Sequence, residues 1–289
     1  TANPQHSRVI ALDEYAAMNL LALGVVPLEV TGSYKSLVSQ DILRDAGSTV
    51  VGTGDSFELN LEAIAAAEPD LIVVTAESGF VAQTEPLSEI AATVVLPYIA
   101  PWRDVIADTA AVVGRAERGE QIIAALDTVV ADAAVTVGEA PYSLSILGQT
   151  FGIVFAVSPE AVLSAVADEV GVTRPLAQTT AEPMAGFASI ISLSTELLGE
   201  HDADVVAVMR GEFYDDTIVT EAATYQALSA VESGNSVIVD GDMWFGTHPF
   251  AIYWILQDLE ALAEGGRQDA VGDTSDASGR WSEFLEVVG

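Results

Sequence analysis

The sequence contains no cysteine, so disulfide bonds and thiolate metal ligands are excluded. Basic residues are also scarce. Lysine occurs once, at Lys35, and 43 acidic residues outnumber 10 basic ones, which gives a formal net charge of −33. A surface of this charge repels the phosphates of nucleic acids and of anionic lipids. We therefore expect neither as a partner, and we interpret the acidic excess as a solubilising surface.

Long apolar runs are absent as well. No stretch of about 18 uninterrupted apolar residues occurs, so the sequence predicts no membrane span. Yet 50% of the residues are hydrophobic and the mean hydropathy is +0.38. This apolar content predicts buried strands and alanine-rich helices. A chain of 289 residues is long enough for two domains of ordinary size.

Residues for metal binding and catalysis are few. His6, His201 and His248 are dispersed, without the spacing of a metal site, and we predict a capping or packing role for His248. The chain has neither a G-x-S-x-G motif nor a cysteine nucleophile. We interpret the adjacent carboxylates Asp13 and Glu14 as a solvent-exposed helix start. These absences predict a protein that is not an enzyme and that holds no metal and no cofactor.

The longest helical pattern spans Glu120–Val137, which contains neither glycine nor proline and places apolar residues at helical spacing. Strands and helices alternate on both sides of it. We therefore predict an N-terminal α/β lobe at residues 1–114, a helix joining the lobes at 115–138, and a C-terminal α/β lobe at 139–289. Because a continuous helix resists bending, we expect the connection to be rigid.

Short apolar runs and amphipathic segments predict the other elements, and their alternation indicates mainly parallel sheets covered by helices. The predicted strands are Arg8–Leu12, Pro27–Val30, Val50–Val51, Leu71–Thr75, Val94–Leu96, Tyr142–Leu147, Thr150–Val157, Asp204–Met209 and Val237–Asp240. The predicted helices are Ala16–Leu23, a short helix capped by Asn60, Pro86–Ala91, Asp104–Val113, Pro159–Val170, Ser194–Leu198, Thr224–Ala230, Pro249–Ala263 and Trp281–Val287. The polar stretch Thr31–Ser39 is predicted to be a loop.

Open α/β sheets bind ligands beyond the C-terminal ends of their strands. In this sequence those ends carry aromatic residues, two arginines and a few hydroxyl groups, which is typical of a binding site rather than a catalytic one. The residues concerned are Tyr15, Gly54-Asp55, Glu77-Ser78 and Trp102-Arg103 in the first half, and Thr150-Phe151, Met209-Arg210, Phe213-Tyr214 and Trp244-Phe245 in the second.

Each of these residues has a structural alternative. Trp102 and Trp244 could pack the rims of the lobes instead of contacting a ligand. Arg103 and Arg210 could pair with neighbouring carboxylates. The glycine-rich turn Gly52–Asp55 lacks the pattern of a phosphate-binding loop, so we predict a plain turn there.

Three sequence blocks resemble a known family: Arg8–Gly24, Asn60–Val73 and Pro101–Asp104, the last leading into the long helix. The family is that of the substrate-binding proteins of iron–siderophore, haem and cobalamin ABC importers, and the similarity extends more weakly to Ile191–Met209 and Trp244–Ala263. The resemblance implies two α/β lobes bridged by one long helix, with a metal chelate bound between the lobes.

The resemblance also implies roles for particular residues. The ligand is expected on aromatic and arginine side chains, and a surface glutamate of each lobe is expected to dock onto the membrane permease. The matching ligand-binding residues are Tyr15, Trp102, Arg103, Arg210, Tyr214, Trp244 and Phe245. The matching docking residues are Glu62, in Asn60-Leu61-Glu62, and Glu196, in Ser194-Thr195-Glu196, where the family has Ser-Leu-Glu. The alternative for both glutamates is a first-turn carboxylate on a helix dipole.

A ferric siderophore of the hydroxamate or carboxylate type suits this set of residues, whereas a highly anionic catecholate would need more than two cationic groups. Haem, with Tyr15 or His248 as an iron ligand, and cobalamin stay open as ligands. Alternatives of other classes are a two-lobed α/β enzyme, such as a metal chelatase, and a surface adhesion module.

The resemblance further implies an extracytoplasmic protein that acts as a monomer. It would be anchored by lipid to the outer face of the cell membrane, or periplasmic. No signal peptide is recognisable in Thr1–Ser7.

Overall fold

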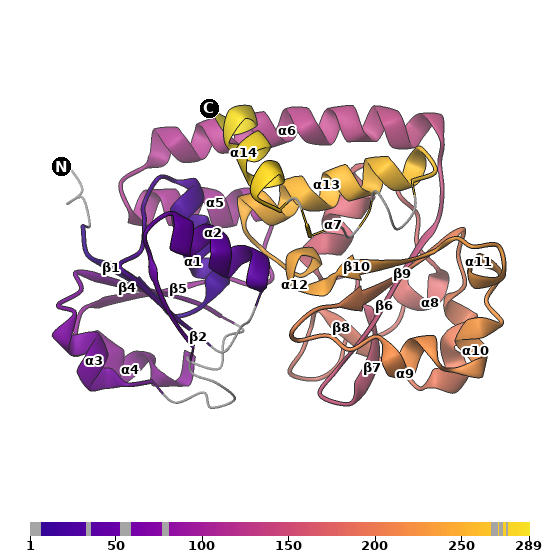
Figure 1. Ribbon diagram of the computed structural model, residues 1–289, viewed down its shortest axis with the longest axis horizontal. Coiled ribbons are helices and arrows are strands. Elements are labelled where there is room, and N and C mark those ends of the chain that lie inside the picture. The colour runs from indigo at the N-terminus through magenta and orange to yellow at the C-terminus, as the bar shows by residue number, and fades with distance from the viewer. Residues whose placement is uncertain are drawn as a thin grey trace. The chain divides into compact units, whose positions relative to one another are not determined.

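The computed structural model describes residues 7–32, 36–52, 59–76, 81–266, 271, 274–275 and 277–289. The chain forms two compact units (Figure 1). Unit 1 comprises Thr1–Ala125, Thr247–Phe250 and Ser278–Gly289, and unit 2 comprises Leu126–Gly246 and Ala251–Ala277. Some residues singled out above lie outside the described residues, namely His6, Lys35, Gly54-Asp55 and Glu77-Ser78.

Unit 1 contains a five-stranded sheet of order β3-β2-β1-β4-β5, in which all neighbouring strands are parallel. The chain winds from β1 outward to β3, then returns to the other side of β1 for β4 and β5, so the winding changes direction between β1 and β4. Ligands of open parallel sheets bind at such a point. The strands are β1 (Val9–Ala11), β2 (Glu29–Gly32), β3 (Thr49–Gly52), β4 (Leu71–Thr75) and β5 (Ala92–Leu96).

Helices cover both faces of this sheet. On one face, Ile64 of α3 (Leu61–Ala66) and Leu87 of α4 (Thr84–Ser88) pack against β1 and β4 in a single apolar cluster. On the opposite side lie α1 (Glu14–Ala22), α2 (Leu37–Asp45) and α5 (Trp102–Val112) (Figure 1). The short 3-10 helix η1 (Val81–Gln83) precedes α4.

Side-chain caps set the starts of three of these helices, α1, α2 and α3, and the cap of α1 is Asp13. The predicted cap at Asn60 is confirmed, since its side chain accepts a hydrogen bond from Ala63 N at 3.0 Å. The loop predicted at Thr31–Ser39 is wrong. There β2 continues to Gly32 and α2 begins at Leu37, because the Ser36 hydroxyl accepts from Ser39 N and so provides a helix cap.

Unit 2 contains a five-stranded sheet of order β10-β9-β6-β7-β8. The strands β10, β9 and β6 are parallel, whereas β7 is antiparallel to both of its neighbours. A hairpin joins β6 and β7 through Phe151 and Gly152, whose φ angles are +48° and +76°, as a tight two-residue turn requires. The strands are β6 (Leu144–Thr150), β7 (Ile153–Val157), β8 (Ile190–Ser192), β9 (Val205–Arg210) and β10 (Ser236–Asp240).

The helices of unit 2 are mostly short. One apolar cluster joins β6, β7 and β9 to the segments η2 (Thr195–His201), α9 (Thr217–Thr220), α10 (Ala223–Gln226) and α11 (Ser229–Glu232). The prediction of one helix at Thr224–Ala230 is therefore wrong, and the helix predicted to start at Ser194–Leu198 is the 3-10 helix η2. The other helices of this part of the chain are α7 (Val162–Glu169), α8 (Leu176–Thr179), α12 (Gly241–Trp244) and α13 (Pro249–Ala263).

The predicted long helix is α6 (Ala116–Glu139), which belongs to unit 1 up to Ala125 and to unit 2 from Leu126. It begins one residue after the predicted start of the joining helix at residue 115, and four residues before the apolar pattern at Glu120. Gly119 therefore lies inside it, where a Cβ would stand 2.6 Å from Ala110 Cβ of α5. In unit 1, Arg118 donates to the carbonyls of Val288 (2.5 Å) and Gly289 (2.7 Å) at the end of α14 (Ala277–Val288).

By length and composition alone, α6 could cross a membrane, with a mean hydropathy of 1.5 over 18 residues. A single helix of this kind is only weak evidence for a membrane span. Its fully buried residues, Ile122, Leu126, Ala133 and Val137, recur at helical spacing, which is the pattern of a helix packed along one side. The predicted fold class, two α/β parts with mainly parallel sheets and one long helix, is confirmed. The lobe boundaries at residues 114 and 138 stay predictions.

Candidate functional site

Asp13 occupies the point in unit 1 where the winding changes direction. Its carboxylate accepts hydrogen bonds from Ala16 N (2.8 Å) in α1 and from Thr75 N (2.6 Å) and Thr75 Oγ1 (2.7 Å) at the end of β4. Asp13 is fully buried, and this burial raises the pKa of its carboxyl group. Glu14 is buried too and accepts from Ser36 N. The predicted solvent-exposed helix start is therefore wrong, because these carboxylates accept from backbone N–H groups inside the protein.

Unit 1 also contains a group of ring-bearing side chains, one of which, Tyr15, lies two residues after Asp13. The ring of Tyr15 lies 5.7 Å from that of Tyr98 and 6.4 Å from that of His248. Burial lowers the pKa of His248 to about 3, so its imidazole is neutral at physiological pH. Trp102 begins α5 and is buried, with the guanidinium carbon of Arg103 4.0 Å from its ring centre, a cation–π contact.

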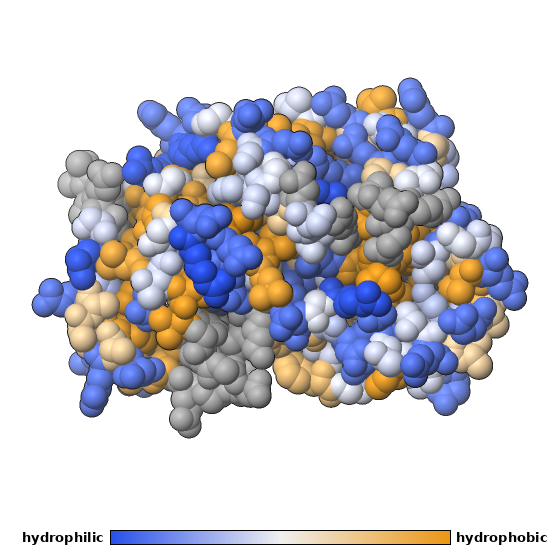
Figure 2. All heavy atoms as spheres, in the orientation of Figure 1, coloured by the Kyte–Doolittle hydropathy of each residue, from blue (hydrophilic) through white to orange (hydrophobic). Residues whose placement is uncertain are grey.

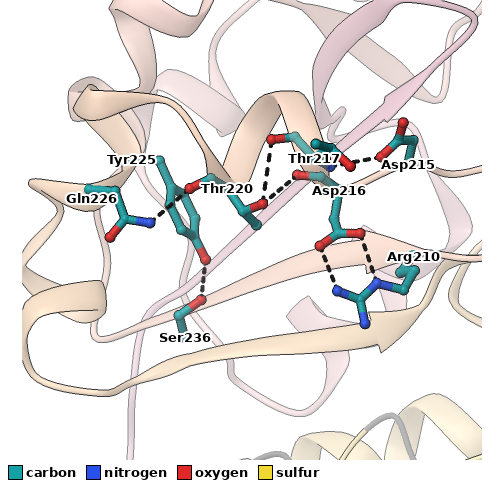
Figure 3. Close-up of polar contacts among 8 residues, drawn as sticks. All are labelled: Arg210, Asp215, Asp216, Thr217, Thr220, Tyr225, Gln226 and Ser236. Atoms are coloured by element: carbon teal, nitrogen blue, oxygen red, sulfur yellow. Dashed lines mark hydrogen bonds and ion pairs between the residues drawn. The ribbon is translucent and has the colours of Figure 1, made fainter.

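In unit 2 the winding changes direction between β6 and β9, and Arg210 ends β9 at that point. Its Nε and Nη2 donate to the two carboxylate oxygens of Asp216, each at 2.7 Å (Figure 3). The backbone N–H of Asp215 donates to the carbonyl of Gln149 in β6 at 3.0 Å. The segment after β9 is thus tied to both central strands.

An aromatic cluster in unit 2 includes two of the predicted ligand residues. Tyr214 and Phe245 are stacked, with ring centres 5.6 Å apart and planes 10° apart, and Phe155 contacts both rings edge-on. A Cβ at Gly241 would stand 2.4 Å from the ring of Tyr214. The position of the Tyr214 ring therefore depends on glycine at residue 241.

A buried carboxylate holds the start of the same segment. Asp242 of α12 accepts a hydrogen bond from Glu212 N at 3.0 Å, and a Cβ at Gly211 would stand 2.4 Å from its Oδ2. Burial, with a further contribution from the charge of Asp240, raises the pKa of Asp242 to about 7. Asp242 therefore ties the segment after β9 to the helix after β10.

Trp244 lies in the interior of unit 2. It has no exposed surface, and its indole N–H donates to Oδ2 of Asp258, which is also fully buried, at 2.8 Å. This contact fixes the end of α12, from which Phe245 follows. A direct contact of Trp244 with a ligand stays a prediction.

The seven predicted ligand residues are divided between the units. Three of them, Tyr15, Trp102 and Arg103, belong to unit 1, and Arg210, Tyr214, Trp244 and Phe245 belong to unit 2. Of the residues that hold these side chains, Asp13 was predicted as a solvent-exposed helix start, and five were not predicted at all, namely Tyr98, Phe155, Asp216, Gly241 and Asp242. The adjacent pair Asp215-Asp216, just after an arginine and two aromatics, was a signal that could have identified Asp216.

The two predicted docking glutamates occupy equivalent places. Glu62 and Glu196 are exposed in the first turns of α3 and η2, and each lies eight residues before an aspartate, Asp70 or Asp204, that precedes a central strand. Asp70 accepts from the backbone N–H of Ser7 (2.9 Å), and Asp204 accepts from that of Ser143 (2.8 Å). Each unit therefore carries an exposed glutamate in the first turn of a helix, eight residues before such an aspartate. The two helices differ in type, since α3 is an α-helix with a side-chain cap and η2 is a 3-10 helix without one.

Among the described residues, no group of three or more His, Asp or Glu side chains is placed to hold a metal ion. Hydrophilic side chains cover much of the face shown in Figure 2, interleaved with apolar ones. The residues described above for the two units include aromatic rings, arginines and buried carboxylates. This combination suits binding of a ligand with both apolar and polar parts.

Comparison with known proteins gives a family and several relatives. The periplasmic binding protein family model matches residues 9–243. The probable siderophore-binding lipoprotein YfiY of Bacillus subtilis (strain 168) is 28% identical over 280 residues, which cover 90% of this chain and 82% of that protein.

Solved structures share the fold. The siderophore periplasmic binding protein from the fuscachelin gene cluster of Thermobifida fusca is 23% identical, with a TM-score of 0.70, over 91% of this chain and 98% of that one. FhuD2 from Staphylococcus aureus with bound ferrioxamine B is 17% identical, with a TM-score of 0.70, over 98% of this chain and 100% of that one.

Proposed function

This chain belongs to the periplasmic binding protein family, and we propose that it captures a ferric siderophore outside the cytoplasm and delivers it to an ABC permease. The family consists of binding proteins, in agreement with the prediction that the chain is not an enzyme. A siderophore of the hydroxamate or carboxylate type is the favoured ligand, and the seven predicted residues are its proposed contacts.

The main observation in support is the Tyr214–Phe245 stack. Tyr214 lies four residues after Arg210, which ends β9 at the point where the winding of the sheet changes direction. Aromatic faces cover the apolar backbone of a chelate, and arginine N–H groups donate to its oxygens. The names of the relatives agree with this chemistry, since YfiY is named siderophore-binding and the FhuD2 structure holds ferrioxamine B.

Haem is the second candidate ligand within the family. Both residues that could ligate its iron are buried, with exposed fractions of 6% for Tyr15 and 1% for His248. Iron ligation would require these side chains to leave their ring contacts with each other. We therefore favour a siderophore, in which the iron is already fully ligated by the chelator.

A ligand titration tests the proposal. We expect a ferric trihydroxamate to quench tryptophan fluorescence with submicromolar affinity, because the chain contains four tryptophans and a ferric chelate absorbs their emission. Ferric citrate, haem and cobalamin complete the panel. Tight binding of haem or cobalamin without any response to ferric siderophores would overturn the ligand assignment, and turnover of a chelate by the purified protein would favour an enzyme.

Gly241→Ala is expected to weaken siderophore binding by about tenfold, because the added methyl group would displace the Tyr214 ring and break its stack with Phe245. Binding is measured by the same titration, and folding by thermal melting. Gly199→Ala is the matched control, since nothing lies within 4 Å of a Cβ at Gly199. Equal affinities of the two variants would show that the stack does not contact the ligand.

For delivery, we propose that Glu62 and Glu196 bind basic pockets of the permease. The equivalent local arrangements of the two residues support a matched pair of docking points. We further propose that the protein acts as a monomer held at the outer face of the membrane by a lipid, as the name lipoprotein of YfiY suggests.

A further inference from the structure

Arg210 is the last residue of β9, and a carboxylate already neutralises its charge. Two hydrogen bonds of 2.7 Å join its Nε and Nη2 to both oxygens of Asp216 (Figure 3). Such a two-bond pair is planar and strong. The side chain of Arg210 is 61% exposed and that of Asp216 is 14% exposed. A ligand that reaches Arg210 from solvent therefore meets a cation together with its counter-ion.

The pair still leaves hydrogen-bond donors. A guanidinium group carries five N–H groups, of which Asp216 takes two. No other described residue accepts a hydrogen bond from the guanidinium group of Arg210. The remaining N–H groups can donate to the oxygens of a chelate, so Arg210 is suited to act as a donor rather than as a counter-charge.

The charges of the same segment favour this interpretation. Between residues 210 and 216, Arg210 is accompanied by three carboxylates, Glu212, Asp215 and Asp216. Asp215 is exposed and accepts from the backbone N–H of Thr217 at 2.8 Å. An anionic chelate would meet net negative charge here, whereas an uncharged or cationic chelate would not be repelled.

We propose that Asp216 determines the charge class of the ligand, by pairing with Arg210 so that the protein selects uncharged or cationic ferric hydroxamates over anionic chelates. This inference rests on the proposed siderophore-binding function. In a ferric trihydroxamate the three hydroxamate anions balance the charge of Fe³⁺, so the iron centre is neutral and offers oxygens that accept hydrogen bonds.

The test uses three ligands with the same iron centre. Ferrioxamine B carries a pendant ammonium group, its N-acetyl derivative is neutral and its N-succinyl derivative carries a carboxylate. Each is titrated at low, constant ionic strength, because salt would screen the difference. For the wild-type protein we expect the cationic form to bind about tenfold or more tightly than the anionic form.

Two carboxylate variants separate the ion pair from general charge. Asp216→Asn releases the positive charge of Arg210, and we expect the preference for the cationic form to fall to about threefold or less. Asp215→Asn removes the same charge one residue away but leaves the ion pair intact, so most of the preference should remain. Within the described part of the chain, Arg210 is the one side chain that hydrogen-bonds to the Asp216 carboxylate, so folding should survive, which thermal melting checks.

Arg210→Gln probes the pair from the other side. It leaves Asp216 without its cation, so the preference for the cationic ligand should increase. Equal effects of Asp215→Asn and Asp216→Asn, or tighter wild-type binding of the anionic form, would overturn the role of Asp216 while siderophore binding stands. If none of the three ligands binds the wild-type protein, the proposed binding of a hydroxamate siderophore fails instead.

Discussion

Charge reversal of both docking residues, Glu62→Arg together with Glu196→Arg, is expected to abolish delivery of iron to the cell interior while ligand affinity stays unchanged. Like charges placed opposite each other across an interface cost several kcal/mol, so uptake should fall on the order of 100-fold. Both residues are exposed in first helical turns, so folding should tolerate the change. Uptake of radiolabelled ferric siderophore by cells that carry the transporter measures the effect.

The matched control is Glu120→Arg together with Glu200→Arg. These glutamates are also exposed, one in each unit, and their reversal changes the net charge by the same amount. We expect this control to retain nearly normal uptake. If both double variants lose uptake equally, the acidic surface as a whole rather than two specific docking points would mediate delivery.

Asp13→Ala is expected to lower the free energy of unfolding by about 2–4 kcal/mol, because Thr75 N and Ala16 N would be left buried without an acceptor. Urea denaturation monitored by circular dichroism measures the loss. Asp13→Asn keeps one acceptor oxygen and should cost less. Since α1 carries Tyr15 two residues after its cap Asp13, the alanine variant should also weaken ligand binding.

The variant Asp41→Ala provides the control for Asp13→Ala. Its carboxylate makes an exposed salt bridge with Arg44 three residues away, at 3.0 Å, and such pairs contribute about 0–1 kcal/mol. If Asp13→Ala were no more destabilising than Asp41→Ala, the buried carboxylate would not stabilise the junction of β1 and β4. Its place at that junction would then require another explanation.

The fold followed from local patterns in the sequence. The buried run Leu71–Thr75 is β4 with the predicted bounds, and Pro249–Ala263 is α13 with the predicted bounds. Both segments carry enough apolar residues for their periodicity alone to predict the type and bounds of the element. The prediction missed α2 and replaced α10 and α11 by one helix, because the bounds of short elements depend on single caps and turns.

The sequence also identified residues at the ends of strands, because the alternation of strands and helices brings those ends to one edge of each sheet. It did not identify their partners. Three contacts show this: the ion pair of Arg210 with Asp216, the hydrogen bond from Trp244 to Asp258 and the hydrogen bond from Thr75 to Asp13. Each joins two residues whose distance depends on loop conformation.

The amino-acid sequence by itself therefore determined the α/β class, the long helix and the types of side chain available for a ligand, since these depend on periodicity and composition. Only the tertiary structure decided which of those side chains are buried, which are stacked and which charge is neutralised. The physical reason is that a hydrogen bond or an ion pair depends on distances of a few ångströms, which the conformation of the chain between the two residues sets. Hydrophobic patterns constrain such distances only loosely.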